Sequence, residues 1–201
     1  MEKTVSFRDF EERDIDFIYK CKNDDSLNSM IVGEYHHFTY EEATKWVHGC
    51  MGEHETYKFW AVCTNDVEKR IVGWVSLSEI DRMNRSASLY GIVIADPQYR
   101  DGFAWIESYL FVYEYAFNQL RLEKVFGEAF TDHILSQSIR KAFYAETIEL
   151  KERAVFREGK YHDLSKGVML NWIYKEHFEK GDYDPCKIIR RISKFVKQAK
   201  E

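Results

Sequence analysis

The chain has 201 residues and a mass of 24.0 kDa, which is the size of one large domain. With 45% hydrophobic and 16% aromatic residues it carries enough apolar surface to fold, which excludes wholesale disorder. The net charge of -5 and the pI near 5.9 do not favour binding to nucleic acid, so we expect a small-molecule or protein partner.

Strands are predicted where apolar residues alternate over short runs, and helices where they recur every three or four residues. Strands are predicted at 5–7, 58–64, 71–80, 86–94, 124–130, 148–156 and 168–174. Helices are predicted at 11–22, after the capping residue Thr39, at 102–120 and at 136–144. This order predicts a mixed α/β or α+β domain built on one sheet.

The last 26 residues, 176–201, form a separate extension beyond a domain at 1–175. From Cys186 onward, apolar residues line one face of a predicted helix and lysines and arginines fill the rest. We expect the apolar face to pack on its own domain or on a second subunit. A membrane surface or an acidic partner is the alternative for this basic helix.

The cysteines and the N-terminus indicate the compartment. The four cysteines form no C-x-x-C pair, and no histidine pair has the carboxylate neighbours of a metal site, so free thiols and no bound metal are expected. The first ten residues lack an apolar run, and no stretch is long enough to span a bilayer. The sequence therefore predicts a cytoplasmic protein and does not favour a membrane.

The segment from Ile92 to Ala104 carries the chemical signal. A strand stops at Pro97 and passes through a loop containing Gly102 into a long helix. The free amides of a first helical turn, together with the helix dipole, attract an anion such as a phosphate. Taken alone, this pattern is also typical of an ordinary turn.

In its context the segment resembles the GNAT superfamily of acyl-CoA N-acetyltransferases, in particular the branch with the ribosomal-protein N-terminal and aminosugar acetyltransferases. The resemblance covers about residues 5–174 and implies the family's single mixed, mostly antiparallel twisted sheet flanked by helices. It rests on the order and spacing of Phe7-Arg8-Asp9-Phe10, Ile71-Val72-Gly73-Trp74-Val75-Ser76-Leu77, Asp81-Arg82-Met83-Asn84-Arg85-Ser86-Ala87, Tyr115-Ala116-Phe117, Leu122-Glu123-Lys124-Val125 and Arg157-Glu158-Gly159-Lys160-Tyr161-His162-Asp163.

The resemblance implies a binding site for acetyl-CoA, whose pyrophosphate the family holds on the amides of an Arg/Gln-x-x-Gly-x-Gly/Ala loop. Gly102 and Ala104 match the two small positions, whereas Tyr99 stands where the pattern has Arg or Gln, and Asp101 adds a negative charge. The implied cofactor-binding residues are Ile92, Val93, Ile94, Tyr99, Arg100, Asp101, Gly102, Phe103, Ala104, His133 and Ser136.

The resemblance also implies direct attack of a primary amine on the thioester, which needs a base, a stabilised oxyanion and an acid for the leaving thiolate. Glu79 and Tyr90 are the candidate bases, and Glu79 is alternatively a solvated strand-end carboxylate. Arg140 occupies the position of the family's tyrosine acid. Tyr144, one turn later, is the candidate acid or else a core aromatic residue.

The acceptor side is expected in the polar and aromatic loops 28–40 and 159–163, which include Glu34, Tyr35 and Asp163. The acceptor is predicted to be a small amine, an aminosugar or a peptide N-terminus, and a homodimer is an option. The alternative function is a catalytically altered module that keeps the fold for acyl-CoA binding or assembly.

Overall fold

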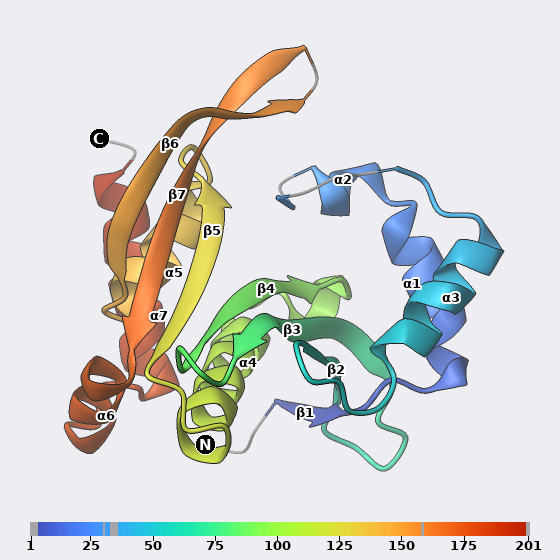
Figure 1. The fold of residues 1–201 in the computed structure, drawn as a ribbon, viewed down its shortest axis with the longest axis horizontal. Coiled ribbons are helices and arrows are strands. Elements are labelled where there is room, and N and C mark those ends of the chain that lie inside the picture. The colour runs from blue at the N-terminus through green and yellow to red at the C-terminus, as the bar shows by residue number, and fades with distance from the viewer. Residues whose placement is uncertain (1–3, 30, 33–35, 158, 200–201) are drawn as a thin grey trace. The chain divides into compact units, whose positions relative to one another are not determined.

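The structure is a computed structural model that describes residues 4–29, 31–32, 36–157 and 159–199 (Figure 1). Its seven-stranded sheet has the order β1-β2-β3-β4-β5-β7-β6. The strands are β1 Val5–Arg8, β2 Lys58–Thr64, β3 Ile71–Asp81, β4 Ser86–Ile94, β5 Lys124–Phe130, β6 Glu146–Arg157 and β7 Lys160–Leu170. The helices are α1 Ile15–Lys22, α2 Asp25–Asn28, α3 Tyr40–Cys50, α4 Phe103–Glu114, α5 Ile134–Ala142, α6 Asn171–Glu179 and α7 Pro185–Gln198. The predicted mixed, mostly antiparallel sheet flanked by helices is confirmed.

The chain divides into two compact units. The first unit consists of residues 1–80 and 90–112, and the second of residues 81–89 and 113–201. Within the second unit, β4 begins parallel to β5, with Ser86–Ser88 registered against Lys124–Phe126. From Tyr90 onward, β4 belongs to the first unit.

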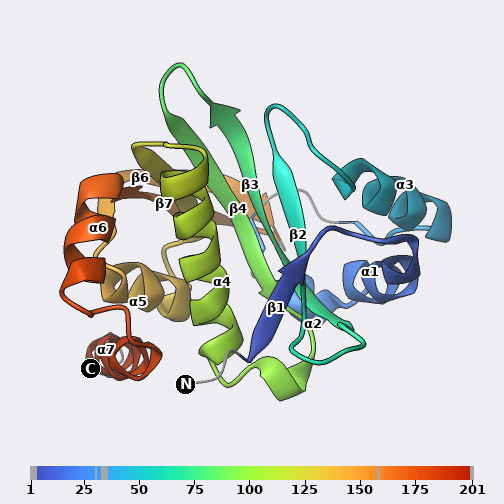
Figure 2. The same cartoon turned by 90° about the horizontal axis from the view of Figure 1, so that it is seen from below.

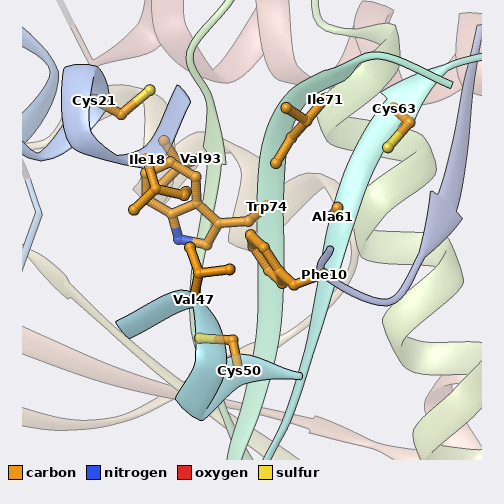
Figure 3. Packing of buried hydrophobic residues seen from close by; sticks show 10 residues of the cluster. All are labelled: Phe10, Ile18, Cys21, Val47, Cys50, Ala61, Cys63, Ile71, Trp74 and Val93. Atoms are coloured by element: carbon orange, nitrogen blue, oxygen red, sulfur yellow. The ribbon is translucent and has the colours of Figure 1, made fainter. Parts of the chain in front are cut away.

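The first unit has helices on both faces of its strands. Figure 2 shows α1 and α3 on one side of β1–β3 and α4 on the other. On the α4 side, Phe111 stacks on Phe7 at a centroid distance of 4.0 Å and meets Trp60 edge-on. On the other side a buried cluster packs around Trp74 (Figure 3). Both faces of the central strands are therefore buried, as seven consecutive buried residues from Ile71 to Leu77 require.

The second unit packs α5 on the antiparallel strands β5, β7 and β6. The α7 helix covers α5: Ile188 is fully buried, and Arg191 donates hydrogen bonds to the carbonyls of Ala142 and Asp182 at 3.0 and 2.8 Å. The Tyr183 hydroxyl also donates to the Phe143 carbonyl. The apolar face of the tail helix thus packs on its own unit, as expected from its amphipathic pattern.

The predicted strand at 168–174 is wrong at both ends. β7 starts at Lys160, because its polar first residues are held by the ladder to β6 and need no apolar pattern, whereas the ladder to β5 begins only at Leu164. The chain turns into α6 at Asn171, where the adjacent Ile173 and Tyr174 are both buried while Trp172 is 61% exposed. Asn171 and Tyr174, three residues apart, are both buried, which is the spacing of one helical face.

Candidate active site

The loop between β4 and α4 is the first part of the site, and its conformation depends on Gly102. Gly102 has φ +100°, in the region that only glycine adopts without strain, although a Cβ there would meet open space. The Asp101 carboxylate accepts a 3.0 Å hydrogen bond from the Phe103 amide and so caps α4. Ala104 is fully buried, and the Ser108 hydroxyl donates to its carbonyl.

Arg100 turns back from this loop to the end of β4. Its guanidinium donates hydrogen bonds to the carbonyls of Ile94 at 3.0 Å and Ala95 at 2.7 Å. Tyr99 is half-buried and ends the short turn that starts at Pro97, where Asp96 caps the Gln98 amide. Arg100 therefore closes the strand end and leaves anion binding at the loop to main-chain donors.

The remaining donors fit an anionic group. The first-turn amides of the twelve-residue helix α4 lack intrahelical acceptors, and the Asp101 carboxylate occupies the amide of Phe103 alone. The Trp105 indole nitrogen, in the same turn, is buried and has no hydrogen-bond partner among the described residues. A phosphate can be held by such donors, with Asp101 as an opposing charge.

Gly73 is a site residue that the sequence reasoning missed. A Cβ on Gly73 would lie 2.0 Å from the carbonyl oxygen of Val93, so the β3 backbone approaches β4 more closely than any side chain permits. Beside it, the Val72 carbonyl accepts hydrogen bonds from the amides of Ala95 and Asp96. These contacts set the position of Ile92–Ile94. A glycine inside an otherwise apolar strand was the available signal.

The two candidate bases both lie on strands of the first unit, near solvent. Glu79 is exposed and has φ +49°, an uncommon conformation for a residue with a side chain. Tyr90 is 59% exposed, and its carbonyl accepts a 2.8 Å hydrogen bond from the Ser76 hydroxyl. Gly91, which follows, has φ +86° and interrupts regular strand geometry at this point of β4.

In the second unit, His133 and Ser136 lie together at the N-terminus of α5. The Ser136 hydroxyl and His133 Nδ1 are 2.6 Å apart, with His133 in the N-cap position. Burial lowers the pKa of His133, against a smaller raising effect of Asp132. The imidazole is therefore neutral at pH 7, and in the tautomer with the proton on Nε2 it accepts from Ser136.

Tyr144 lies just beyond the opposite end of α5. Its ring stacks on His177 of α6 at 3.5 Å, and the Arg191 guanidinium of α7 lies 4.9 Å from its centroid. Arg140 reaches across to the sheet, where it donates to the Ser165 hydroxyl at 2.9 Å and to the Gly127 carbonyl. The structure thus brings His133 and Ser136 together and holds Tyr144 between α6 and α7.

Of the predicted acceptor loops, Glu34 and Tyr35 lie outside the described residues. The described part of the first loop is polar, with His37 Nε2 2.8 Å from Asp25 and the Tyr40 hydroxyl donating to Asp16. The predicted second loop at 159–163 is wrong, because Lys160 to Asp163 belong to β7, where Tyr161 pairs with Phe156 of β6 and is 52% exposed.

The family model described as an acetyltransferase (GNAT) domain matches residues 4–143, which include β1 to α5. The chain belongs to the GNAT acetyltransferase family. It is accordingly an enzyme that transfers an acetyl group to an amine, with acetyl-CoA as the co-substrate. Membership in the ribosomal-protein or aminosugar branch is not part of this match. A search of curated proteins finds no match.

Solved structures share the fold at low sequence identity. A spermidine N-acetyltransferase from Vibrio cholerae in complex with CoA and spermine has a TM-score of 0.76 at 20% identity, over 87% of this chain and 99% of that chain. A GNAT-family acetyltransferase from Bacillus anthracis has a TM-score of 0.71 at 16% identity, over 86% and 98%. A GCN5-related N-acetyltransferase from Brucella melitensis has a TM-score of 0.70 at 15% identity, over 89% and 83%.

In the part of the chain that the structure describes, no three His, Cys, Asp or Glu side chains gather in a way that could hold a metal ion. None of the helices in the same residues combines the length and apolar character needed to cross a membrane.

Proposed function

We propose that the acceptor is a primary amine, carried by a small molecule, an aminosugar or a protein N-terminus, and that it attacks the acetyl thioester directly. The observation that supports this most is the loop from Ile94 to Ala104. There a left-handed Gly102 leads into a helix start with open main-chain donors. We also propose that the enzyme belongs to the ribosomal-protein and aminosugar branch of the family, on the sequence features described above.

The chain's own residues would divide three tasks. Glu79 or Tyr90, both exposed on strands of the first unit, would take the proton from the acceptor ammonium. A backbone N–H of β4 near Ile92–Ile94 would stabilise the oxyanion. Tyr144 is proposed as the acid for the thiolate, and His133 with Ser136 as cofactor-binding groups. Acetyl-CoA, when bound, supplies the activated acetyl group.

A thermal unfolding titration with acetyl-CoA, followed by a thiol-release assay with a panel of primary amines, tests this proposal. A ligand that binds only the folded state raises the unfolding midpoint, so the midpoint should rise with acetyl-CoA concentration. Thiol release should then appear with at least one class of amine. Absence of a midpoint shift at millimolar acetyl-CoA would contradict the proposal.

The second candidate is an acyl-CoA-binding or assembly module without turnover. Two observations favour it: the Asp101 carboxylate at the helix start, and Arg140, bound to Ser165 and Gly127, at the position of the family's acid. This function predicts a midpoint shift with acetyl-CoA but no thiol release with any amine of the panel.

We further propose a cytoplasmic location and a homodimer. Cys21, Cys50 and Cys63 are buried free thiols and Cys186 is an exposed one, which suits a reducing compartment. The dimer would use the outer strand β6, which exposes Ile148, Leu150 and Phe156.

A further inference from the structure

Lys22, the last residue of α1, holds its ammonium against three aromatic rings of the first unit. Its Nζ atom lies 4.9 Å from the ring centroid of Trp46, 5.3 Å from Phe38 and 5.6 Å from Trp74. The rings come from α3, from the segment before it and from β3. A cation is attracted to aromatic faces, but the three N–H donors of an ammonium still need acceptors.

Among the described residues, no carboxylate pairs with Lys22. Burial lowers the pKa of this lysine, and the groups that oppose the effect are the thiols of Cys50 and Cys21. Burial raises the pKa of each of these thiols to about 12, so both are neutral at pH 7 and supply no counter-charge. Lys22 is thus a partly buried cation with no anionic partner among the described residues.

The other buried cations of this unit are paired. The Lys58 side chain is 4% exposed and lies 2.7 Å from Asp9 and 2.5 Å from Glu53. Burial acts to lower the pKa of Lys58, but these hydrogen bonds outweigh it and raise the pKa overall. Arg8 likewise pairs with Asp14 at 2.7 Å. Because a charge taken out of water is costly without a partner, the lack of an anion beside Lys22 among the described residues calls for an explanation.

Two of the three rings link Lys22 to features of the site. Phe38 lies in the predicted acceptor loop 28–40, and Trp74 lies on β3 in the same buried cluster as Val93, the middle residue of the segment 92–94 that is proposed to lie beside the thioester (Figure 3). Lys22 therefore borders the loop that is predicted to hold the acceptor.

We propose that Lys22 binds an anionic group, a carboxylate or a phosphate, carried by the acceptor amine. The inference rests on the proposed transfer to a primary amine and narrows it to acceptors with a negative charge. A polyamine offers no anion and would bring further ammonium groups to a lysine that has no counter-ion in the described part of the chain.

Matched acceptor pairs test the inference. Glucosamine 6-phosphate with glucosamine, and glycylglycine with glycylglycinamide, differ within each pair only in the anion, and the two pairs separate phosphate from carboxylate recognition. The wild type should prefer the anionic member of at least one pair by tenfold or more in kcat/KM, and should disfavour spermidine. Equal turnover within both pairs, or a preference for spermidine, would overturn the inference.

Two variants then assign the preference to Lys22. Lys22→Met keeps the apolar stem and should bring the ratio of anionic to neutral kcat/KM to within about threefold of one, whereas Lys22→Arg should retain a preference. A ratio unchanged in Lys22→Met contradicts the inference.

Stability gives a separate criterion, with Lys58→Met as the matched control. Lys58→Met leaves Asp9 and Glu53 unpaired and should lower the unfolding midpoint. Lys22→Met removes an uncompensated charge and should leave the midpoint unchanged or raise it. A fall as large as that of Lys58→Met would mean that Lys22 has a structural role only.

Binding separates a failure of this inference from a failure of the proposed function. If acetyl-CoA binds but no acceptor releases thiol, the proposed transfer fails, and the unfolding midpoint with each acceptor decides the role of Lys22. A larger shift with an anionic member, lost in Lys22→Met, supports the anion site. Equal shifts within both pairs overturn it.

Discussion

At the residue scale, Gly73 shows how an absent side chain positions a strand. Substitution by alanine would force its Cβ into the Val93 carbonyl, which is backbone and cannot move without shifting β4. We expect Gly73→Ala to lose about 1–3 kcal/mol of stability, as for other overpacked sites, and to weaken acetyl-CoA binding as well. Chemical denaturation and a ligand titration measure the two effects.

Gly49→Ala is the matched control for this substitution. Gly49 lies inside α3, and a Cβ there meets nothing within 4 Å. Because alanine is the better helix former, Gly49→Ala should stabilise the protein by up to about 1 kcal/mol. A loss of stability in Gly49→Ala equal to that of Gly73→Ala would refute the explanation by close strand approach.

The buried thiols make stability depend on alkaline pH. Burial raises the pKa of Cys21 and Cys50 to about 12 from 9.0, so the folded state keeps protons that the unfolded state releases above pH 9. The stabilisation is therefore present below pH 9 and is lost as the pH rises toward 12. Within this window, each thiol lowers the free energy of unfolding by about 1.4 kcal/mol for every unit by which the pH rises.

Urea unfolding of the wild type and Cys50→Ala between pH 8 and 10.5 measures this contribution. The fall in stability above pH 9 should be less steep in the variant, and below pH 9 the two slopes should agree. Parallel curves over the whole range would show that Cys50 does not take part.

At the element scale, the Asp101 carboxylate at the start of α4 caps the helix, but its negative charge disfavours the binding of a phosphate there. Asp101→Asn keeps an oxygen acceptor for the Phe103 amide and removes the carboxylate charge. We expect acetyl-CoA to bind about two- to fivefold more tightly to this variant at low ionic strength, and the gain to shrink with added salt. Asp101→Ala, which removes the cap too, should lose about 1 kcal/mol of stability.

The α7 helix is an integral part of the second unit. Ile188 is fully buried on it, so Ile188→Ala should cost about 2–5 kcal/mol in the free energy of unfolding. Lys194→Ala, on the exposed face of the same helix, should change it by less than about 0.5 kcal/mol. Denaturant midpoints of the two variants provide the comparison, and equal midpoints would argue against close packing of α7.

The elements also show where sequence patterns suffice. The limits of β2, β4 and β5 follow from their short apolar runs and flanking turns, and the Thr39 capping box marks the start of α3. The polar half of β7 could not be predicted in this way, because its neighbours in the sheet define it. The candidate site is likewise predictable only in part. Gly102 predicts the loop from sequence, whereas the contacts of Arg100 with the Ile94 carbonyl and of Tyr144 with His177 depend on tertiary packing.

At the scale of the whole molecule, the outer strand β6 predicts self-association. Ile148, Leu150 and Phe156 are 50%, 70% and 63% exposed on a strand that ends the sheet. Antiparallel pairing of two copies about Leu150 would set Glu149 opposite the partner's Lys151, which favours a second copy as the occupant. Light scattering at micromolar concentration should therefore report a dimer.

Leu150→Glu should convert this dimer to a monomer without loss of fold. Val67→Glu, at a fully exposed position of the first unit, is the matched control and should remain dimeric. A monomeric wild type would exclude the proposed assembly.

The interleaving of the two units affects synthesis on the ribosome. Each unit contains two chain segments, so neither is finished before the other has begun. The first can close once Val112 has emerged, while residues 86–88 still wait for their partners at 124–126. The second is complete only when α7 arrives at the end of the chain. A nascent chain paused after residue 112 would therefore present an unpaired strand start, a stage at which early chaperone binding would protect it from aggregation.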